Sequence, residues 1–267
     1  MSKVNKYELI TLTAGDCAEN HARMEQIGEK REEGQGFTVT ELADIKSNME
    51  TTLGLNCHLV NLCEALGEVE MKCPEASILI IKNGVDRLLG YENAKDDLFR
   101  EQMGLDYDKK AFMYGRVVNK HARWNLCFDR ESREADYPNK KGTIVGYDRV
   151  PLMRKLMKKY KRYFGDKARG LKMESNYYYD TRKTGIGFHG DSERVIVIAC
   201  RIGYASVPIH FQWFYQGEAV GQRVVIDLQP GDVYIMSETA VGTNWKRRAV
   251  LTLRHATGCD KFTSSSV

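Results

Sequence analysis

His189 and Asp191 are the two residues of this chain whose types and spacing best suit metal chemistry. They stand two positions apart in the stretch GFHGDSE, just after a predicted turn at Thr184-Gly185. On an extended strand, side chains two residues apart project from the same face, so an imidazole and a carboxylate would converge there. Such a pair supplies two of the three ligands of the 2-His-1-carboxylate triad, which leaves iron positions open for substrate and oxygen.

A third ligand has to come from further along the chain, where two histidines follow Asp191. We predict that His210, in a strand-like run at residues 208–214, packs in or beside the core. His255 is better separated from Asp191 for closing a triad across a barrel. We expect it to be the third ligand, because a site with two protein ligands would hold iron poorly. The alternative is a degenerate site that binds no iron.

Three motifs in this half of the chain resemble those of one enzyme family. Asn176-x-Tyr178, His189-x-Asp191-x-Glu193 and the run RAVLTLR at residues 248–254 occur in this order. They are similar to the N-x-Y, H-x-D-x-E and R-x-x-L-T-x-R patterns of AlkB-like Fe(II)/2-oxoglutarate-dependent dioxygenases. The resemblance covers roughly residues 110–258 and leaves residues 1–104 outside it. It implies a double-stranded β-helix, or jelly roll, that uses Fe(II), the cosubstrate 2-oxoglutarate and O2 to hydroxylate a C–H bond.

The same matching implies a role for each motif. His189 and Asp191 would ligate the iron. A guanidinium forms a bidentate pair with a carboxylate, which suits a dicarboxylate cosubstrate. The residues expected near or on 2-oxoglutarate are Asn176, Tyr178, Arg248 and Arg254.

The chain departs from the family pattern at the second histidine, which the family often places shortly after a tryptophan. Here Arg247 stands in that place after Trp245, and an arginine that keeps its proton does not bind iron. If His255 is the ligand instead, strand alternation turns Arg248 and Arg254 away from the metal. Lys261 or another cation would then have to bind the cosubstrate, unless a β-bulge re-aims one side chain.

A basic and aromatic cluster precedes these motifs, and the resemblance places it in a lid that covers the substrate. Such a cluster can stack on a base or pair with phosphate, although a solvated loop has the same composition. The helix predicted at residues 151–164 is also rich in lysine and arginine, either as a solvated face or as a phosphate-contacting surface. The cluster consists of Arg116, Lys120, His121, Arg123 and Trp124, of which we take Arg116, Arg123 and Trp124 as candidate substrate-binding residues.

These observations lead to one hypothesis and two alternatives. The hypothesis is a dioxygenase that hydroxylates or oxidatively demethylates a nucleobase in nucleic acid. The first alternative keeps the chemistry but acts on a protein side chain or a small metabolite. The second is a non-catalytic β-barrel binding module with a degenerate metal site.

The predicted elements describe an α+β protein: a jelly roll with flanking helices, preceded by a small α/β region. Short strands at residues 194–202, 208–214, 223–228, 232–237 and 248–256 indicate a sandwich or jelly roll. Strands at 7–13, 56–62 and 76–82 alternate with helices at 17–33 and 40–53, the second capped by Thr38 or Thr40. We therefore expect two domains, residues 1–104 of unknown role and residues 105–267 with the dioxygenase-like fold.

Composition sets the outer limits. With 267 residues, 42% hydrophobic and 28% charged, the chain is globular, and it contains no apolar run of the length a membrane span needs. Seven scattered cysteines without a C-x-x-C pair argue against a disulfide framework and a structural zinc site, and favour a reducing intracellular compartment. A net charge of +4 is too small to identify a polyanion-binding protein by itself. Oligomeric state stays open.

Overall fold

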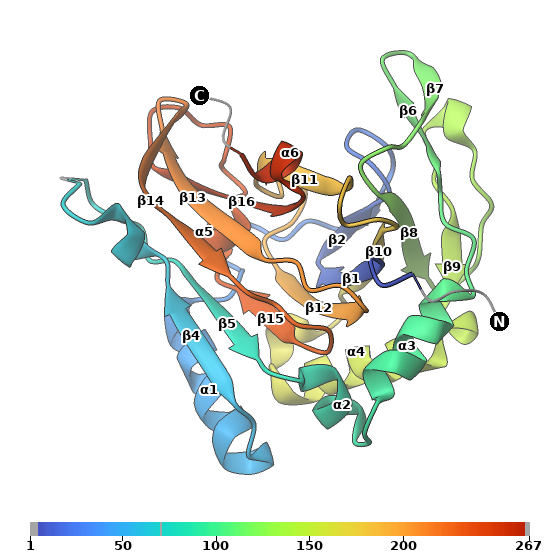
Figure 1. Ribbon diagram of the computed structural model, residues 1–267, viewed down its shortest axis with the longest axis horizontal. Coiled ribbons are helices and arrows are strands. Elements are labelled where there is room, and N and C mark those ends of the chain that lie inside the picture. Colours follow the sequence, from blue (N-terminus) through green and yellow to red (C-terminus); the bar gives the residue numbers. More distant parts are fainter. Residues whose placement is uncertain (1–4, 70, 265–267) are drawn as a thin grey trace.

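The computed structural model describes residues 5–69 and 71–264 and confirms the mixed α+β class (Figure 1). Within these residues, eight strands form a large sheet in the order β4-β5-β15-β12-β1-β10-β8-β9, and four form a small sheet in the order β11-β16-β13-β14. Every strand pair in them is antiparallel except β8 with β9. Two ribbons, β2-β3 and β6-β7, stand apart from both sheets.

The strands of the large sheet are β1 (Leu9–Gly15), β4 (Cys57–Asn61), β5 (Ser77–Ile81), β8 (Trp124–Asp129), β9 (Ile144–Gly146), β10 (Lys172–Tyr178), β12 (Val197–Gly203) and β15 (Val233–Met236). Those of the small sheet are β11 (Gly185–His189), β13 (Ile209–Tyr215), β14 (Glu218–Ile226) and β16 (Thr252–Gly258). The ribbons are β2 (Cys17–Glu19) with β3 (Gln26–Gly28) and β6 (Lys110–Met113) with β7 (Arg116–Asn119). The helices are α1 (Val39–Leu53), α2 (Gly84–Leu89), α3 (Ala94–Met103), α4 (Pro151–Tyr163), α5 (Glu238–Val241) and α6 (Asp260–Thr263).

Both faces of the large sheet are buried, as strand β12 illustrates. Ile198, Cys200 and Ile202 join an apolar cluster with the buried face of α4, whereas Val197 and Ala199 join a second cluster with β13 of the small sheet. Successive side chains on a strand point to opposite faces, so an unbroken apolar run can fill two cores. Helices α1 to α4 therefore cover one face of the large sheet and the small sheet covers the other, while α5 and α6 pack beside the small sheet (Figure 1).

The predicted helix at residues 40–53 is α1, and its start follows from local chemistry. The Thr38 hydroxyl accepts a hydrogen bond from the Glu41 backbone N–H, and the Glu41 carboxylate accepts one from the Thr38 N–H. This reciprocal capping box satisfies two backbone donors that the first helical turn leaves free. Leu42, Ile45 and Met49 bury one face of the helix against the core.

Residues 1–104 do not fold as a separate domain, which corrects the predicted boundary between residues 104 and 105. Strand β1 lies in the middle of the large sheet, paired with β12 on one side and β10 on the other. One apolar cluster unites Ile10 and Leu42 with Met173 and Ile198. All seven residues of β1 are buried, so both of its edges must be paired, and the partners come from beyond residue 170.

The helix predicted at residues 17–33 is wrong: this segment contains the ribbon β2-β3. A charged stretch has helix-like composition but lacks an apolar stripe that a helix could bury. The backbone is instead held by the carboxylate of Asp16, which accepts hydrogen bonds from the N–H groups of Arg31, Val195 and Ile196.

The other strand predictions match β12, β13, β14 and β15, but the last strand begins at Thr252 rather than at Arg248. The backbone carbonyl and the guanidinium of Arg248 both bond to Gln216, in the turn between β13 and β14. The turn thus holds Arg248 away from the strand that RAVLTLR was expected to form.

One disulfide joins Cys63 to Cys73, a pairing that the sequence analysis did not predict, while the other five cysteines are free. None of the described helices combines the length and the apolar composition that crossing a bilayer demands.

Candidate metal centre

A cavity of about 710 Å³ lies between the facing sides of the two sheets. The same strand alternation that sends Ile10 and Leu12 to the helices turns Thr11 and Thr13 of β1 toward this cavity. The β2-β3 ribbon and the segment after β11 complete its walls. Residues important to the argument that line the cavity are Glu19, Arg123, Glu174, Asn176, Tyr178, His189, Asp191, Glu193, Arg194, Arg201, Tyr234, Trp245, His255 and Thr257.

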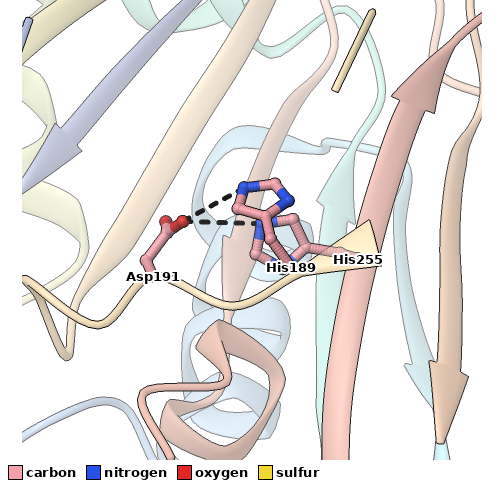
Figure 2. A group of neighbouring side chains, drawn as sticks. All are labelled: His189, Asp191 and His255. Carbon is pink, nitrogen blue, oxygen red and sulfur yellow. Dashed lines mark ion pairs between the residues drawn. The ribbon is translucent and has the colours of Figure 1, made fainter. Parts of the chain in front are cut away.

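His189, Asp191 and His255 converge in one wall of the cavity (Figure 2). Oδ1 of Asp191 lies 3.4 Å from Nε2 of His189 and 3.7 Å from Nε2 of His255. One potential ligand atom from each residue lies within 4.8 Å of the others. The structure therefore brings together the three side chains that the sequence singled out, and metal binding by them stays a prediction.

Local backbone structure explains this convergence. His189 ends β11 and pairs directly with His255 of β16, so the two rings are neighbours across the strands. Asp191 follows through Gly190, and its backbone N–H donates to the carbonyl of Val241. A Cβ at Gly190 would lie 2.0 Å from the carbonyl oxygen of Gly242, so a side chain there would push Asp191 out of place.

The protonation states suit metal ligation. Nδ1 of His189 lies 2.8 Å from the carbonyl of Gly187, which can only accept, so Nδ1 donates and Nε2, which faces Asp191, is the ring nitrogen available to a metal. Burial and the neighbouring His189 lower the pKa of His255 to about 4, which leaves its imidazole neutral at pH 7.

Arg194 stabilises the negative charge of Asp191 at Oδ2, the oxygen that does not contact the two histidines. Burial alone would raise the pKa of this carboxyl, but the neighbouring His189 and the charge of Arg194 hold it well below its ordinary value. Nε of Arg194 lies 3.7 Å from Oδ2 of Asp191, and Nη2 contacts the carboxylates of Glu174 at 2.6 Å and Glu193 at 2.7 Å. Sequence reasoning missed Arg194 and Glu174. The signal for Arg194 was an arginine three residues after the candidate ligand.

The residues expected to bind 2-oxoglutarate separate into two groups. Tyr178 and Asn176 lie at the cavity, although the amide of Asn176 is engaged within the protein: it donates to Glu174 and accepts from Arg123 and Asn125. Arg248 and Arg254 do not line the cavity, which corrects their predicted role.

Strand geometry explains the position of Arg254. It neighbours His255 on β16 and so points to the opposite face, where its guanidinium stacks 3.9 Å above the ring of Phe214. Arg248 precedes the strand altogether. Lys261 also lies elsewhere, in a groove beside the β6-β7 ribbon.

Arg201 is the buried cation that the sequence analysis did not identify. It lies on β12, is 1% exposed and lines the cavity. Its Nη2 donates to the Thr257 hydroxyl at 3.1 Å, whereas Nε and Nη1 have no protein acceptor. The signal was a single arginine at an inward position of the otherwise apolar strand VIACRIG.

The candidate substrate residues are distributed over two sites. Arg123 lines the cavity, and Arg116 lies with it in an adjoining groove of about 970 Å³. Trp124 lines neither, because its ring stacks on Tyr179 at 4.4 Å. Lys120 is buried and donates to Asn20 and Asn125, so it supports the fold rather than a phosphate.

The fold and the site thus define a mixed α+β protein with a His-Asp-His cluster in a cavity between two sheets. The chain is 42% identical over 256 residues to "Uncharacterized protein R156" of Acanthamoeba polyphaga mimivirus, a match covering 96% of this chain and 97% of that protein. It belongs to the same family as this viral protein. No model of a known protein family matches the sequence.

Proposed function

We propose that the protein is an Fe(II)/2-oxoglutarate-dependent dioxygenase of the AlkB-like kind, acting on a nucleobase. The observation that carries the proposal is the convergence of His189, Asp191 and His255 at a cavity wall. Two imidazoles and one carboxylate suit ferrous iron and would leave coordination positions open for substrate and oxygen. When bound there, iron with 2-oxoglutarate and O2 supplies the oxidation of a C–H bond.

The strand order supports a jelly roll, which has eight strands in two sheets. From β10 to β16 the chain places strands in the large, small, large, small, small, large and small sheet in turn. These are seven strands, and the eighth strand of a jelly roll would lie in the large sheet between β10 and β12. Strand β1 occupies that position. In this interpretation the eighth jelly-roll strand is β1, which comes before the other seven in the chain. The arginine motif at residues 248–254 is therefore not needed to form that strand.

The protein's own groups prepare the site for this chemistry. Arg194 holds Oδ2 of Asp191, which leaves Oδ1 directed at the two imidazoles. The carbonyl of Gly187 fixes the ring of His189 through Nδ1. Outer contacts of this kind orient metal ligands and raise their affinity.

Nucleic acid as the substrate is supported by the groove next to the cavity. Arg123 and His21 line both, so the two are continuous. Among its described lining residues are five exposed or half-buried lysines and arginines and no carboxylate: Lys110, Arg116, Arg123, Lys183 and Lys261. Tyr114, 89% exposed in the turn between β6 and β7, offers a ring for base stacking.

The test is turnover by protein loaded anaerobically with Fe(II) and then supplied with 2-oxoglutarate, O2 and single-stranded DNA or RNA carrying N-methylated bases. Succinate and the altered base are measured by mass spectrometry. We expect both products from the wild type and from His210→Ala, and neither from His189→Ala. Absence of succinate from the iron-loaded wild type, with or without nucleic acid, overturns the dioxygenase proposal. Succinate without base modification overturns only the nucleobase assignment.

A further inference from the structure

The cavity contains two buried arginines, and their surroundings differ. Arg194 is neutralised by the carboxylates of Glu174 and Glu193 and lies near Asp191. Arg201 forms no ion pair with any described carboxylate, and two of its three nitrogens lack an acceptor. A buried charge without a counter-ion is costly, and a guanidinium in a cavity wall whose donors lack protein acceptors is a candidate site for an anion.

The orientation of Arg201 is fixed by a neighbour of the candidate metal ligand. The Thr257 hydroxyl donates to the carbonyl of Pro208 at 2.8 Å and so turns a lone pair toward Nη2 of Arg201. Thr257 lies two residues after His255 on β16, and both side chains line the cavity. Two residues along a strand span about 6.6 Å, so the guanidinium is held within a short molecule's length of the metal ligands.

We propose that Arg201 binds the distal carboxylate of a short 2-oxo dicarboxylate whose other end reaches the metal held by His189, Asp191 and His255. The inference rests on the proposed function and deepens it, because it assigns the cosubstrate anchor to β12 instead of to Arg248 or Arg254. An acid with one carboxylate occupies only the metal end. A dicarboxylate engages both the metal and the guanidinium of Arg201, two of whose nitrogens have no protein acceptor.

A nucleic-acid phosphate is a less suitable occupant of this position. Arg201 is 1% exposed, whereas five of the cations that line the groove are exposed or half-buried. A polymer backbone would have to enter the space between the sheets to reach it. A small free dianion can enter this space whole, because no polymer chain has to follow it.

The experiment compares two acids that share the 2-oxo acid head and differ in the distal carboxylate. Iron-loaded protein is titrated under anaerobic conditions with 2-oxoglutarate and with pyruvate, and binding is followed by calorimetry. We expect the wild type to bind 2-oxoglutarate on the order of 100-fold more tightly than pyruvate. Arg201→Met should abolish this preference while leaving pyruvate affinity unchanged, and Arg201→Lys should retain part of it. Arg254→Met, which removes an arginine outside the cavity, is the matched control and should behave as the wild type.

Each outcome bears on the proposal. Circular dichroism and iron content establish that the variants are folded and loaded. Thr257→Val keeps the charge of Arg201 and removes only the hydroxyl that orients it, so this variant should weaken the binding of 2-oxoglutarate and leave that of pyruvate unchanged. If Arg201→Met keeps the wild-type preference, the anchor is wrong and the dioxygenase proposal stands. If the iron-loaded wild type binds neither acid, both the anchor and the cosubstrate assignment fail. Tighter binding of inorganic phosphate than of 2-oxoglutarate would identify Arg201 as a phosphate site and overturn the inference.

Discussion

Nη2 of Arg194 lies 2.6 Å from the carboxylate of Glu174, and both side chains are buried beside the candidate metal centre. The same guanidinium contacts Glu193 and approaches Asp191. A single positive charge therefore allows three carboxylates to share a small volume. This ion cluster connects the stability of the fold to the charge state of the metal site.

Replacing Arg194 by methionine should destabilise the protein and weaken metal binding together. Removing one partner from a buried ionic cluster leaves uncompensated charges and typically costs about 3–5 kcal/mol. Urea denaturation and metal titration measure the two effects. Arg100→Met, which removes an exposed partner of Asp97 on α3, should leave both measurements near wild type. Unchanged metal affinity in a folded Arg194→Met protein would contradict the supporting role.

His255, and not His210, should determine metal affinity. We expect His255→Ala to lower Fe(II) affinity by more than about 100-fold, because loss of an outer partner of a ligand alone costs 10–100-fold. His210→Ala is a close control, because His210 lies on β13 opposite Ala256, the residue that follows His255. Competition against a chelating dye checks both variants, and an equal loss in the two would show that the effect is structural.

Stability should depend on pH through Glu19. Burial, together with the nearby charges of Glu193 and Glu174, raises the pKa of Glu19 to about 8. The folded carboxyl keeps its proton above pH 4.5, where the unfolded chain releases it, so this contribution to stability is complete below pH 4.5 and is lost as the pH rises through 8.

Glu19→Gln cannot ionise and should therefore be more stable than the wild type at pH 9, by on the order of 1 kcal/mol, and equally stable at pH 4. Urea denaturation at the two pH values measures the difference. Glu218→Gln, at an exposed position of β14, should track the wild type at both. A Glu19→Gln protein whose advantage is the same at both pH values would refute the proposed titration.

Binding of single-stranded oligonucleotides should depend on the groove and not on α4. Each phosphate contact contributes about 0.7 to the slope of log K against log salt. Arg116→Ala and Lys183→Ala should each lower the slope by up to that amount. Arg154→Ala and Lys158→Ala remove cations from α4, outside the groove, and should leave it unchanged. A larger effect from the α4 pair would move the interface to that helix.

Local signals in the sequence predicted much of the fold. Thr38 marked the start of α1, Pro151 marked that of α4, and short apolar runs bounded by turn signals located most strands. The convergence of His189 and Asp191 followed from their spacing, although the structure reaches it through a strand end and Gly190 rather than within one extended strand.

What the sequence could not provide is the partner of each element. Nothing in residues 9–15 reveals that β1 pairs with strands more than 150 positions later, as the register of Thr11 with Asn176 and Arg201 shows. The sequence likewise does not show which face of a strand points into the cavity. The motif at residues 248–254 suggested a cosubstrate role for Arg254, but its neighbour His255 is the residue that lines the cavity. A single arginine in an apolar strand is a weak signal, so Arg201 became recognisable only when the structure showed its guanidinium nitrogens without acceptors at the cavity.

The central position of β1 also bears on how the chain acquires its shape during synthesis. The ribosome releases residues 9–15 well before residues 172–178 and 197–203, which supply both of their pairing edges. Until β10 and β12 have been synthesised, β1, which is fully buried in the folded protein, has no native partner. Pairing between strands so far apart in the sequence is slow. The nascent chain should therefore depend on chaperones that shield its first strand.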